Sequence, residues 1–91
     1  MKFRWDEDKN QKLIRERGFS FEDLICDGEF LSERQNTSSN HKDQFEYHNL
    51  YNGYIYKIKF LIEKDGTRFL KTAYRDSRLN KKYKKLMEEN L

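Results

Sequence analysis

Apolar and polar residues alternate with a period of two in the middle of the chain, which predicts β-sheet. The alternating apolar positions are Tyr54, Tyr56, Ile58, Phe60 and Ile62. The dipeptides Asn52-Gly53 and Asp65-Gly66 bracket this run, and both are favoured in hairpin turns, whose central positions take a positive φ. The pattern therefore predicts two successive hairpins within residues 45–74, which form an antiparallel meander.

Helix signals precede the sheet. Asp6 is a predicted N-cap, residues 7–17 lack strand alternation and turn Leu13 and Ile14 inward, and Gly18 stands where a helix commonly ends. A first helix is therefore expected over residues 7–17.

A second, short helix is predicted directly after the first. Ser20 precedes Asp23 by three residues, which resembles a capping box with Asp in place of the usual Glu. Three apolar side chains then share one helix face: Phe21, Leu24 and Ile25. Cys26 ends the same apolar run and is expected to be a buried thiol.

A third helix is predicted over residues 77–89, with Ser77 as its N-cap. Its apolar residues recur at helical spacing: Leu79, Tyr83, Leu86 and Met87. The remaining faces are rich in lysine, and we interpret them as either a solvated surface or a surface that faces a partner.

The rest of the chain completes the predicted fold. Residues 3–5 form a short strand or edge, residues 26–31 lead into the first strand of the sheet, and the polar residues 32–44 form a mobile connection. The chain is thus predicted to be one domain, residues 1–91, of the α+β class. Two N-terminal helices and a C-terminal helix are expected to pack on an antiparallel sheet of about four strands.

Composition narrows the possible functions. Seven Phe, six Tyr and one Trp favour a folded chain despite its high charge. The sequence has one cysteine and two histidines without metal-ligand spacing, and it has no phosphate-binding loop, dinucleotide fingerprint or nucleophile motif. We therefore expect no metal and no cofactor. Since the sequence has neither a membrane-spanning stretch nor a signal-peptide core, we expect a cytoplasmic protein without membrane contact.

Charge is distributed unevenly along the chain. Residues 1–46 hold eight Lys and Arg against eleven Asp and Glu, whereas residues 47–91 hold eleven against five. A basic half of this kind suggests a polyanionic partner or an acidic protein partner, and a solvated face is the alternative. Basic side chains interleaved with aromatic ones are typical of surfaces that bind single-stranded RNA.

RNA can be cleaved without a metal when its own 2′-hydroxyl attacks the neighbouring phosphate. Arginine suits the phosphate because its charge is permanent, and the candidates are Arg75 and Arg78. The candidates for proton transfer are Lys71, Tyr74 and His48. Among these residue types, only histidine has an ordinary pKa near neutrality, although a histidine on a strand is more often structural.

The N-terminal residues resemble the opening of the BrnT family of bacterial toxins. The matching positions are Phe3, Trp5, Asp6, Lys9, Gly18, Ser20, Phe21, Glu22 and Asp23. The resemblance implies a RelE-like fold and a ribonuclease toxin of a type II toxin–antitoxin pair, neutralised by a small DNA-binding antitoxin protein. Trp5 and Phe21 themselves are expected to be core residues.

The family's signature near the end of the last strand is Ile-Ser-Ala-Arg followed by a later Ser or Thr. Here Thr72 and Ala73 match it, Ser77 matches the later hydroxyl, but Tyr74 stands at the arginine position and Arg75 follows. A shift of one residue along a strand changes the face, so Arg75 can replace the arginine only if the strand has already ended.

Two functional interpretations stay open, a ribonuclease toxin and a non-catalytic module that binds RNA or protein. The expected RNA is mRNA, either free or on the ribosome, and the basic C-terminal helix is also a candidate docking site for an acidic antitoxin helix. Candidate RNA-binding residues beyond the catalytic set are Arg68, Thr72, Ser77, Lys81, Lys82, Lys57 and Lys59.

Overall fold

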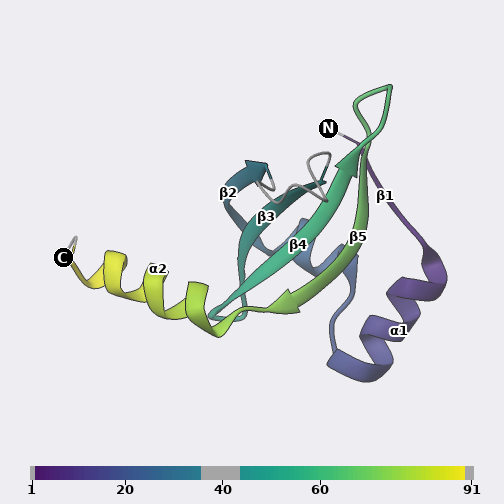
Figure 1. Ribbon diagram of the computed structural model, residues 1–91. Helices are drawn as coiled ribbons and strands as arrows, with labels where there is room; N and C mark the ends of the chain where they lie inside the picture. Colours follow the sequence, from purple (N-terminus) through teal and green to yellow (C-terminus); the bar gives the residue numbers. More distant parts are fainter. Residues whose placement is uncertain (1, 36–43, 90–91) are drawn as a thin grey trace.

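The computed structural model describes residues 2–35 and 44–89. Its elements, in chain order, are β1 (Phe3–Trp5), α1 (Glu7–Arg17), a π-helical turn η1 (Asp23–Asp27), β2 (Glu29–Gln35), β3 (Gln44–Tyr51), β4 (Tyr54–Ile62), β5 (Arg68–Arg75) and α2 (Ser77–Glu89) (Figure 1). The α+β class predicted from the sequence is confirmed. No helix within the described ranges is long and apolar enough to cross a membrane.

One sheet of five strands, in the order β1-β5-β4-β3-β2, forms the centre of the fold. β2 to β5 are antiparallel neighbours, whereas β1 pairs with β5 in parallel, with Phe3 opposite Arg68 and Trp5 opposite Leu70. The predicted antiparallel sheet of about four strands is present as β2 to β5, but the whole sheet has five strands, because β1 joins it in parallel. The short segment Phe3–Trp5 is the added strand, since it finds hydrogen-bonding partners on the free edge of β5.

The two predicted hairpins are present, with different turns. Asn52 and Gly53 both have positive φ, 50° and 75°, and join the directly paired Tyr51 and Tyr54, as expected of a two-residue turn. The loop of the second hairpin is longer, and it is closed by a hydrogen bond from the Glu63 amide to the Thr67 carbonyl at 2.8 Å. Within that loop only Gly66 takes a positive φ, 87°.

α1 begins and ends as the sequence predicts. The Asp6 carboxylate accepts a hydrogen bond from the Asp8 amide at 2.8 Å, and Gly18, at φ 79°, donates its amide to the carbonyls of Leu13 and Ile14. These bonds satisfy backbone groups that a helix leaves open at its ends.

The predicted capping box of Ser20 and Asp23 is also present, with both reciprocal bonds at 3.0 Å. It opens one short helical turn, which widens into η1. Leu24 is buried there, but Cys26 is exposed. The prediction of a buried thiol is wrong, because η1 turns Leu24 towards the sheet and Cys26 towards solvent.

The core lies between the sheet and the N-terminal helices, on what we call the inner face of the sheet. Leu13, Phe19, Phe21 and Leu24 pack there against side chains from β3, β4 and β5. The strand residues in this cluster are Tyr47, Tyr56, Ile58, Phe60, Leu70 and Ala73. Trp5 packs on Phe21 at a ring distance of 5.8 Å, so their predicted core role is confirmed.

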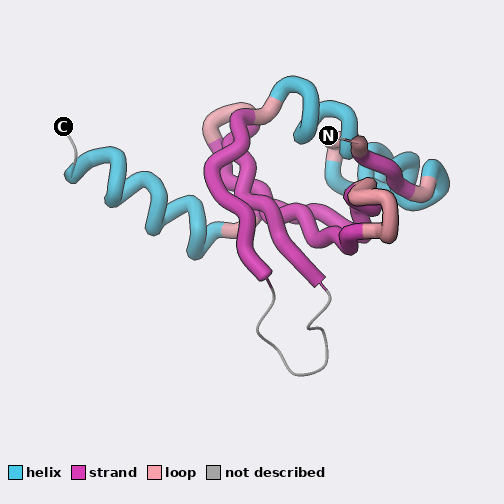
Figure 2. Tube along the Cα trace, turned by 90° about the horizontal axis from the view of Figure 1, so that it is seen from above, coloured by secondary structure: helices cyan, strands magenta, loops and turns pink. Residues whose placement is uncertain are grey.

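α2 differs from the prediction in two ways. Its N-cap is Asp76, whose carboxylate accepts the Leu79 amide at 3.0 Å, whereas the predicted cap Ser77 is the first helical residue. The helix meets the sheet near its start and then projects away from the body of the molecule (Figures 1 and 2). The expectation that it packs on the sheet is therefore wrong for its second half, where Leu86 is 46% exposed.

The predicted polar connection is shorter than expected. Its first residues, Ser32 to Gln35, belong to β2, and Gln44 begins β3. The remainder, residues 36–43, lies outside the described residues.

Candidate functional site

The face of the sheet opposite the core, which we call the outer face, carries two neighbouring rows of polar side chains. Residues that lie opposite one another on adjacent strands point to the same face. The first row runs across four strands as Ser32, His48, Lys57 and Tyr74, and the second as Arg34, Glu46, Lys59 and Thr72. The fold thereby brings together five of the residues singled out in the sequence: His48, Lys57, Lys59, Thr72 and Tyr74.

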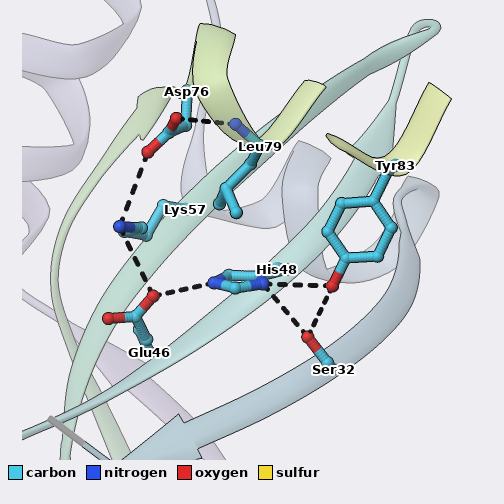
Figure 3. A network of polar contacts seen from close by, with 7 residues as sticks. All are labelled: Ser32, Glu46, His48, Lys57, Asp76, Leu79 and Tyr83. Carbon is cyan, nitrogen blue, oxygen red and sulfur yellow. Dashed lines mark hydrogen bonds and ion pairs between the residues drawn. The ribbon is translucent and has the colours of Figure 1, made fainter. Parts of the chain in front are cut away.

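His48 is the buried centre of the first row, with 2% of its surface exposed. Its Nε2 lies 2.7 Å from Glu46 Oε2, and its Nδ1 lies 3.1 Å from both Ser32 Oγ and the Tyr83 hydroxyl (Figure 3). Ser32 Oγ and the Tyr83 hydroxyl are themselves 2.8 Å apart. Both ring nitrogens are thus engaged.

The partners constrain where the protons lie. An ionised carboxylate only accepts, so Nε2 donates to Glu46, and in the tautomer that this selects Nδ1 is the acceptor. One of the two hydroxyls donates to Nδ1, and the other can donate to that hydroxyl, which satisfies the ring and both hydroxyls. The carboxylate orients the histidine, and the histidine in turn holds Tyr83 and Ser32.

The same carboxylate begins a second chain of charges that reaches α2. Lys57 Nζ lies 3.4 Å from Glu46 and 3.5 Å from Asp76, the residue that caps α2 (Figure 3). Burial raises the pKa of Glu46, but the hydrogen bond from His48 and the charge of Lys57 outweigh it, so the pKa is below its usual value. Burial lowers the pKa of Lys57, yet the negative charge of Glu46 and its neighbours raises it overall.

Uncommitted cations lie beside this network. No carboxylate of the described residues lies within ion-pair distance of Lys59 or Lys71. Lys71 occupies an irregularity in the β4–β5 pairing and holds its Nζ 5.3 Å from the centre of the Phe69 ring. The guanidinium of Arg4 lies 5.6 Å from the same ring, but it is already paired with Glu63 at 2.8 Å. Phe69 is therefore an aromatic surface with two cations near its ring, and of these Lys71 has no ion-pair partner among the described residues.

Arg75 lies on the opposite side of the sheet from these rows. β5 continues through Arg75, which pairs with Tyr56, and its guanidinium lies 4.2 Å from the Tyr54 ring. The strand has not ended before this residue, so the shift of one position places Arg75 on the inner face while Tyr74 stays on the outer face.

Arg68 is also on the inner side and already has a partner. Its Nη2 lies 3.3 Å from Glu33, its Nη1 donates to the Gly66 carbonyl at 3.2 Å, and its side chain is 17% exposed. The remaining predicted residues, Ser77, Arg78, Lys81 and Lys82, are exposed on α2.

Sequence reasoning missed Ser32, Glu46, Asp76 and Tyr83 as members of the network. Glu46 could have been found, because the two-residue turn at Asn52-Gly53 fixes the pairing of β3 with β4 and places Glu46 and His48 opposite Lys59 and Lys57. Among the described residues, no group of three His, Cys, Asp or Glu side chains is arranged to hold a metal ion.

A solved structure shares this architecture. The crystal structure of the Brucella abortus ribonuclease toxin BrnT matches with a TM-score of 0.59 and 22% sequence identity, over 85% of this chain and 97% of that chain. The chain has the fold of a BrnT toxin. The resemblance seen in the sequence is thus confirmed at the level of the fold. No protein-family description and no curated protein matches the sequence.

Proposed function

We propose that the outer face binds and cleaves single-stranded RNA, and that the protein is a ribonuclease toxin. The observation that carries the proposal is the pair of polar rows, with uncommitted lysines and a buried His48–Glu46 pair, on a fold shared with a protein described as a ribonuclease toxin. Cations and hydroxyl groups together on a sheet face that α2 covers only in part suit a phosphate backbone better than a neutral ligand.

RNA binding is assigned to the cationic side of the outer face. Phe69 can stack on an unpaired base, while Lys71, whose Nζ lies 5.3 Å from the ring centre, reaches an adjoining phosphate. Arg4 also lies near this ring, but its ion pair with Glu63 reduces its contribution. Lys59 extends the same cationic surface along the second polar row. Lys57 contributes less, because Glu46 and Asp76 neutralise its charge.

In the proposed cleavage step the 2′-hydroxyl of the RNA attacks the adjacent phosphate. The bond to the 5′-oxygen of the next nucleotide breaks, the attacking hydroxyl loses its proton, and the leaving oxygen gains one, giving a 2′,3′-cyclic phosphate and a 5′-hydroxyl end. Lys59 and Lys71 stabilise the charge on the phosphorane, with Arg78 a further candidate. Tyr74 is the proton-transfer candidate on the surface, whereas the buried His48 acts as a positioning residue.

The test is incubation of the purified chain with single-stranded RNA in the presence of a chelator, followed by analysis of the product ends. The expected products carry a cyclic phosphate. Lys59→Ala combined with Lys71→Ala should weaken RNA binding about tenfold or more and reduce the salt dependence by about two ion equivalents. The matched control is Lys12→Ala with Lys64→Ala, which removes two exposed lysines outside the outer face. Intact RNA together with no growth arrest on expression contradicts the catalytic proposal.

We propose that the protein is one cytoplasmic domain that inhibits translation and growth, and that a cognate antitoxin protein neutralises it as in a type II toxin–antitoxin pair. The fold shared with a toxin supports this proposal. Co-expression with the neighbouring open reading frame tests it, because an antitoxin should co-purify with the chain and restore growth.

A non-catalytic binding module is the second candidate function. It is favoured by the burial of His48, which is 2% exposed, and by the placement of Arg75 on the other face. A binding module retains RNA or partner affinity without any cleavage. If Tyr74→Phe stops cleavage and leaves RNA affinity unchanged, this second function is excluded.

A further inference from the structure

An apolar cavity of about 290 Å³ lies on the inner side of the sheet, next to β2. Its walls include Phe3, Ile25, Phe30 and Tyr47, with Asn49 and Arg68 adding polar atoms. Phe30 is 57% exposed although it is a large aromatic residue. The cavity is thus an apolar surface that the described part of the chain leaves partly uncovered.

Two buried polar atoms of the described residues lack a hydrogen-bond partner, Asn49 Oδ1 and Arg68 Nε. Both residues line this one cavity. Asn49 is 3% exposed and uses its amide nitrogen to donate to the Leu24 carbonyl, which leaves its oxygen as an unused acceptor. A buried acceptor without a donor costs about 1–3 kcal/mol, so a donor supplied from outside stabilises the site.

The chain segment that leads into β2 beside the cavity is acidic, although one of its carboxylates, Glu33, is already paired with the wall residue Arg68 at 3.3 Å. Residues 18–33 contain five carboxylates and no Lys or Arg. Asp27 and Glu29 are exposed and flank Gly28 and Phe30 of the cavity wall. This charge repels RNA and favours a basic partner that also carries an apolar side chain.

α2 of the same protein has this chemistry. Residues 78–85 contain five basic side chains and no acidic one. Tyr83 hydrogen-bonds to the sheet, and every described side chain after it is exposed, including Leu86 at 46%. The helix end extends away from its own sheet (Figure 2). Short helical segments without packing are marginal in water, so this end gains from a partner.

We propose that α2 of one copy docks on the acidic cavity surface of a second copy, and that the two copies exchange this contact reciprocally. Leu86 covers the apolar cavity wall at Phe30. Lys82 and Lys85 face Asp27 and Glu29, and a lysine ammonium donates to Asn49 Oδ1. The reciprocal arrangement has twofold symmetry and therefore closes at two copies.

The test is sedimentation velocity of the full chain over a range of concentrations at low and high ionic strength. A dimer is expected at low ionic strength, with a shift towards monomer at high ionic strength because exposed charge pairs are screened. Two double variants probe the two surfaces, Asp27→Lys with Glu29→Lys and Lys82→Glu with Lys85→Glu. Each alone should weaken dimerisation about tenfold or more, because like charges then face each other.

Mixing the two variants is the decisive measurement. In the mixed pair one contact keeps its native charges and the other has both signs reversed, so both are attractive and the dimer should return. The control variant Lys12→Glu with Lys64→Glu makes the same change in net charge as Lys82→Glu with Lys85→Glu, but on other exposed surfaces, and should dimerise like the wild type. A chain that is monomeric at all concentrations, a dimer insensitive to both reversals, or a mixture that stays monomeric overturns the proposal. Circular dichroism verifies that each variant is folded.

Discussion

The Tyr83 hydroxyl lies 3.1 Å from Nδ1 of His48, and this contact ties the projecting helix α2 to the buried centre of the outer face. The same hydroxyl lies 2.8 Å from Ser32 of β2. Further polar contacts between this end of the chain and the sheet lie near the helix start, where Asn80 accepts the Ile55 amide at 3.2 Å and Asp76 pairs with Lys57 at 3.5 Å. His48 is itself fixed by Glu46 at 2.7 Å. The position of α2 therefore depends on a few polar contacts in the first half of the helix.

Tyr83→Phe should loosen this attachment. The substitution keeps the ring but removes the hydroxyl, so Ser32 alone then donates to His48 Nδ1. We expect a loss of about 1 kcal/mol in the free energy of unfolding, the usual net value of one hydrogen bond. Urea denaturation measures the loss, and faster amide exchange in α2 should accompany it. Lys84→Ala, an exposed neighbour on the same helix, is the control and should change stability by less than about 0.5 kcal/mol.

Acid should weaken the attachment of α2, because it protonates the capping residue Asp76. The backbone hydrogen bond from Leu79 lowers the pKa of Asp76 below its usual value, burial opposes this, and the charge of Lys57 adds to the lowering. Because the folded pKa is the lower one, the stabilisation is complete above the unfolded pKa of about 4 and is lost as pH falls through the folded pKa.

Asp76→Asn should reduce this pH dependence. Asn is also a good N-cap, but it carries no charge to attract Lys57. We expect the difference in unfolding free energy between about pH 5 and about pH 2 to be smaller in this variant than in the wild type. Asp8→Asn removes an exposed carboxylate from α1 and serves as the control. An equal acid sensitivity of wild type and Asp76→Asn contradicts the role given to this cap.

The aromatic core should dominate stability. Phe60 is fully buried and stacks on Tyr47 at a ring distance of 4.2 Å and on Phe45 at 5.6 Å. Phe60→Ala leaves a cavity and should cost about 3–5 kcal/mol, enough to unfold much of a marginal domain. Phe69→Ala, on the outer face, should cost clearly less stability but weaken RNA binding. Urea denaturation and RNA titration of both variants separate the two roles.

Local signals in the sequence predicted much of the fold. The caps of α1, the box of Ser20 and Asp23, and the turn at Asn52-Gly53 all depend on residues within a few positions of one another. The turn also fixes which residues of β3 and β4 lie opposite, so the facing of His48 and Lys57 follows from the sequence.

The errors concern contacts between distant segments. Phe3 pairs with Arg68, and no local pattern in a strand of three residues indicates that partner. Ser32 reaches His48 only because the β2–β3 pairing shifts between Phe30 and Ser32. Tyr83 belongs to the predicted apolar stripe of its helix, but its hydroxyl contacts Ser32 on β2 and His48 on β3, which are distant in sequence.

The neighbouring residues Tyr74 and Arg75 of β5 point to opposite faces of the sheet, which allows the two faces to be tested separately. Tyr74 lies on the outer face opposite Lys57, whereas Arg75 lies on the inner face beside Tyr54. If the outer face binds RNA, Arg75→Ala should leave RNA affinity and cleavage within about twofold, because it removes no phosphate contact there. Tyr74→Arg is the complementary change. It places a guanidinium on the outer face, at the position that matches the arginine of the BrnT signature. RNA binding should become about tenfold stronger, and its salt dependence should steepen by about one ion equivalent. Filter binding at several salt concentrations and a cleavage assay measure both effects. The active site lies on the inner face instead if Arg75→Ala is folded but does not cleave RNA, and if Tyr74→Arg binds and cleaves RNA like the wild type.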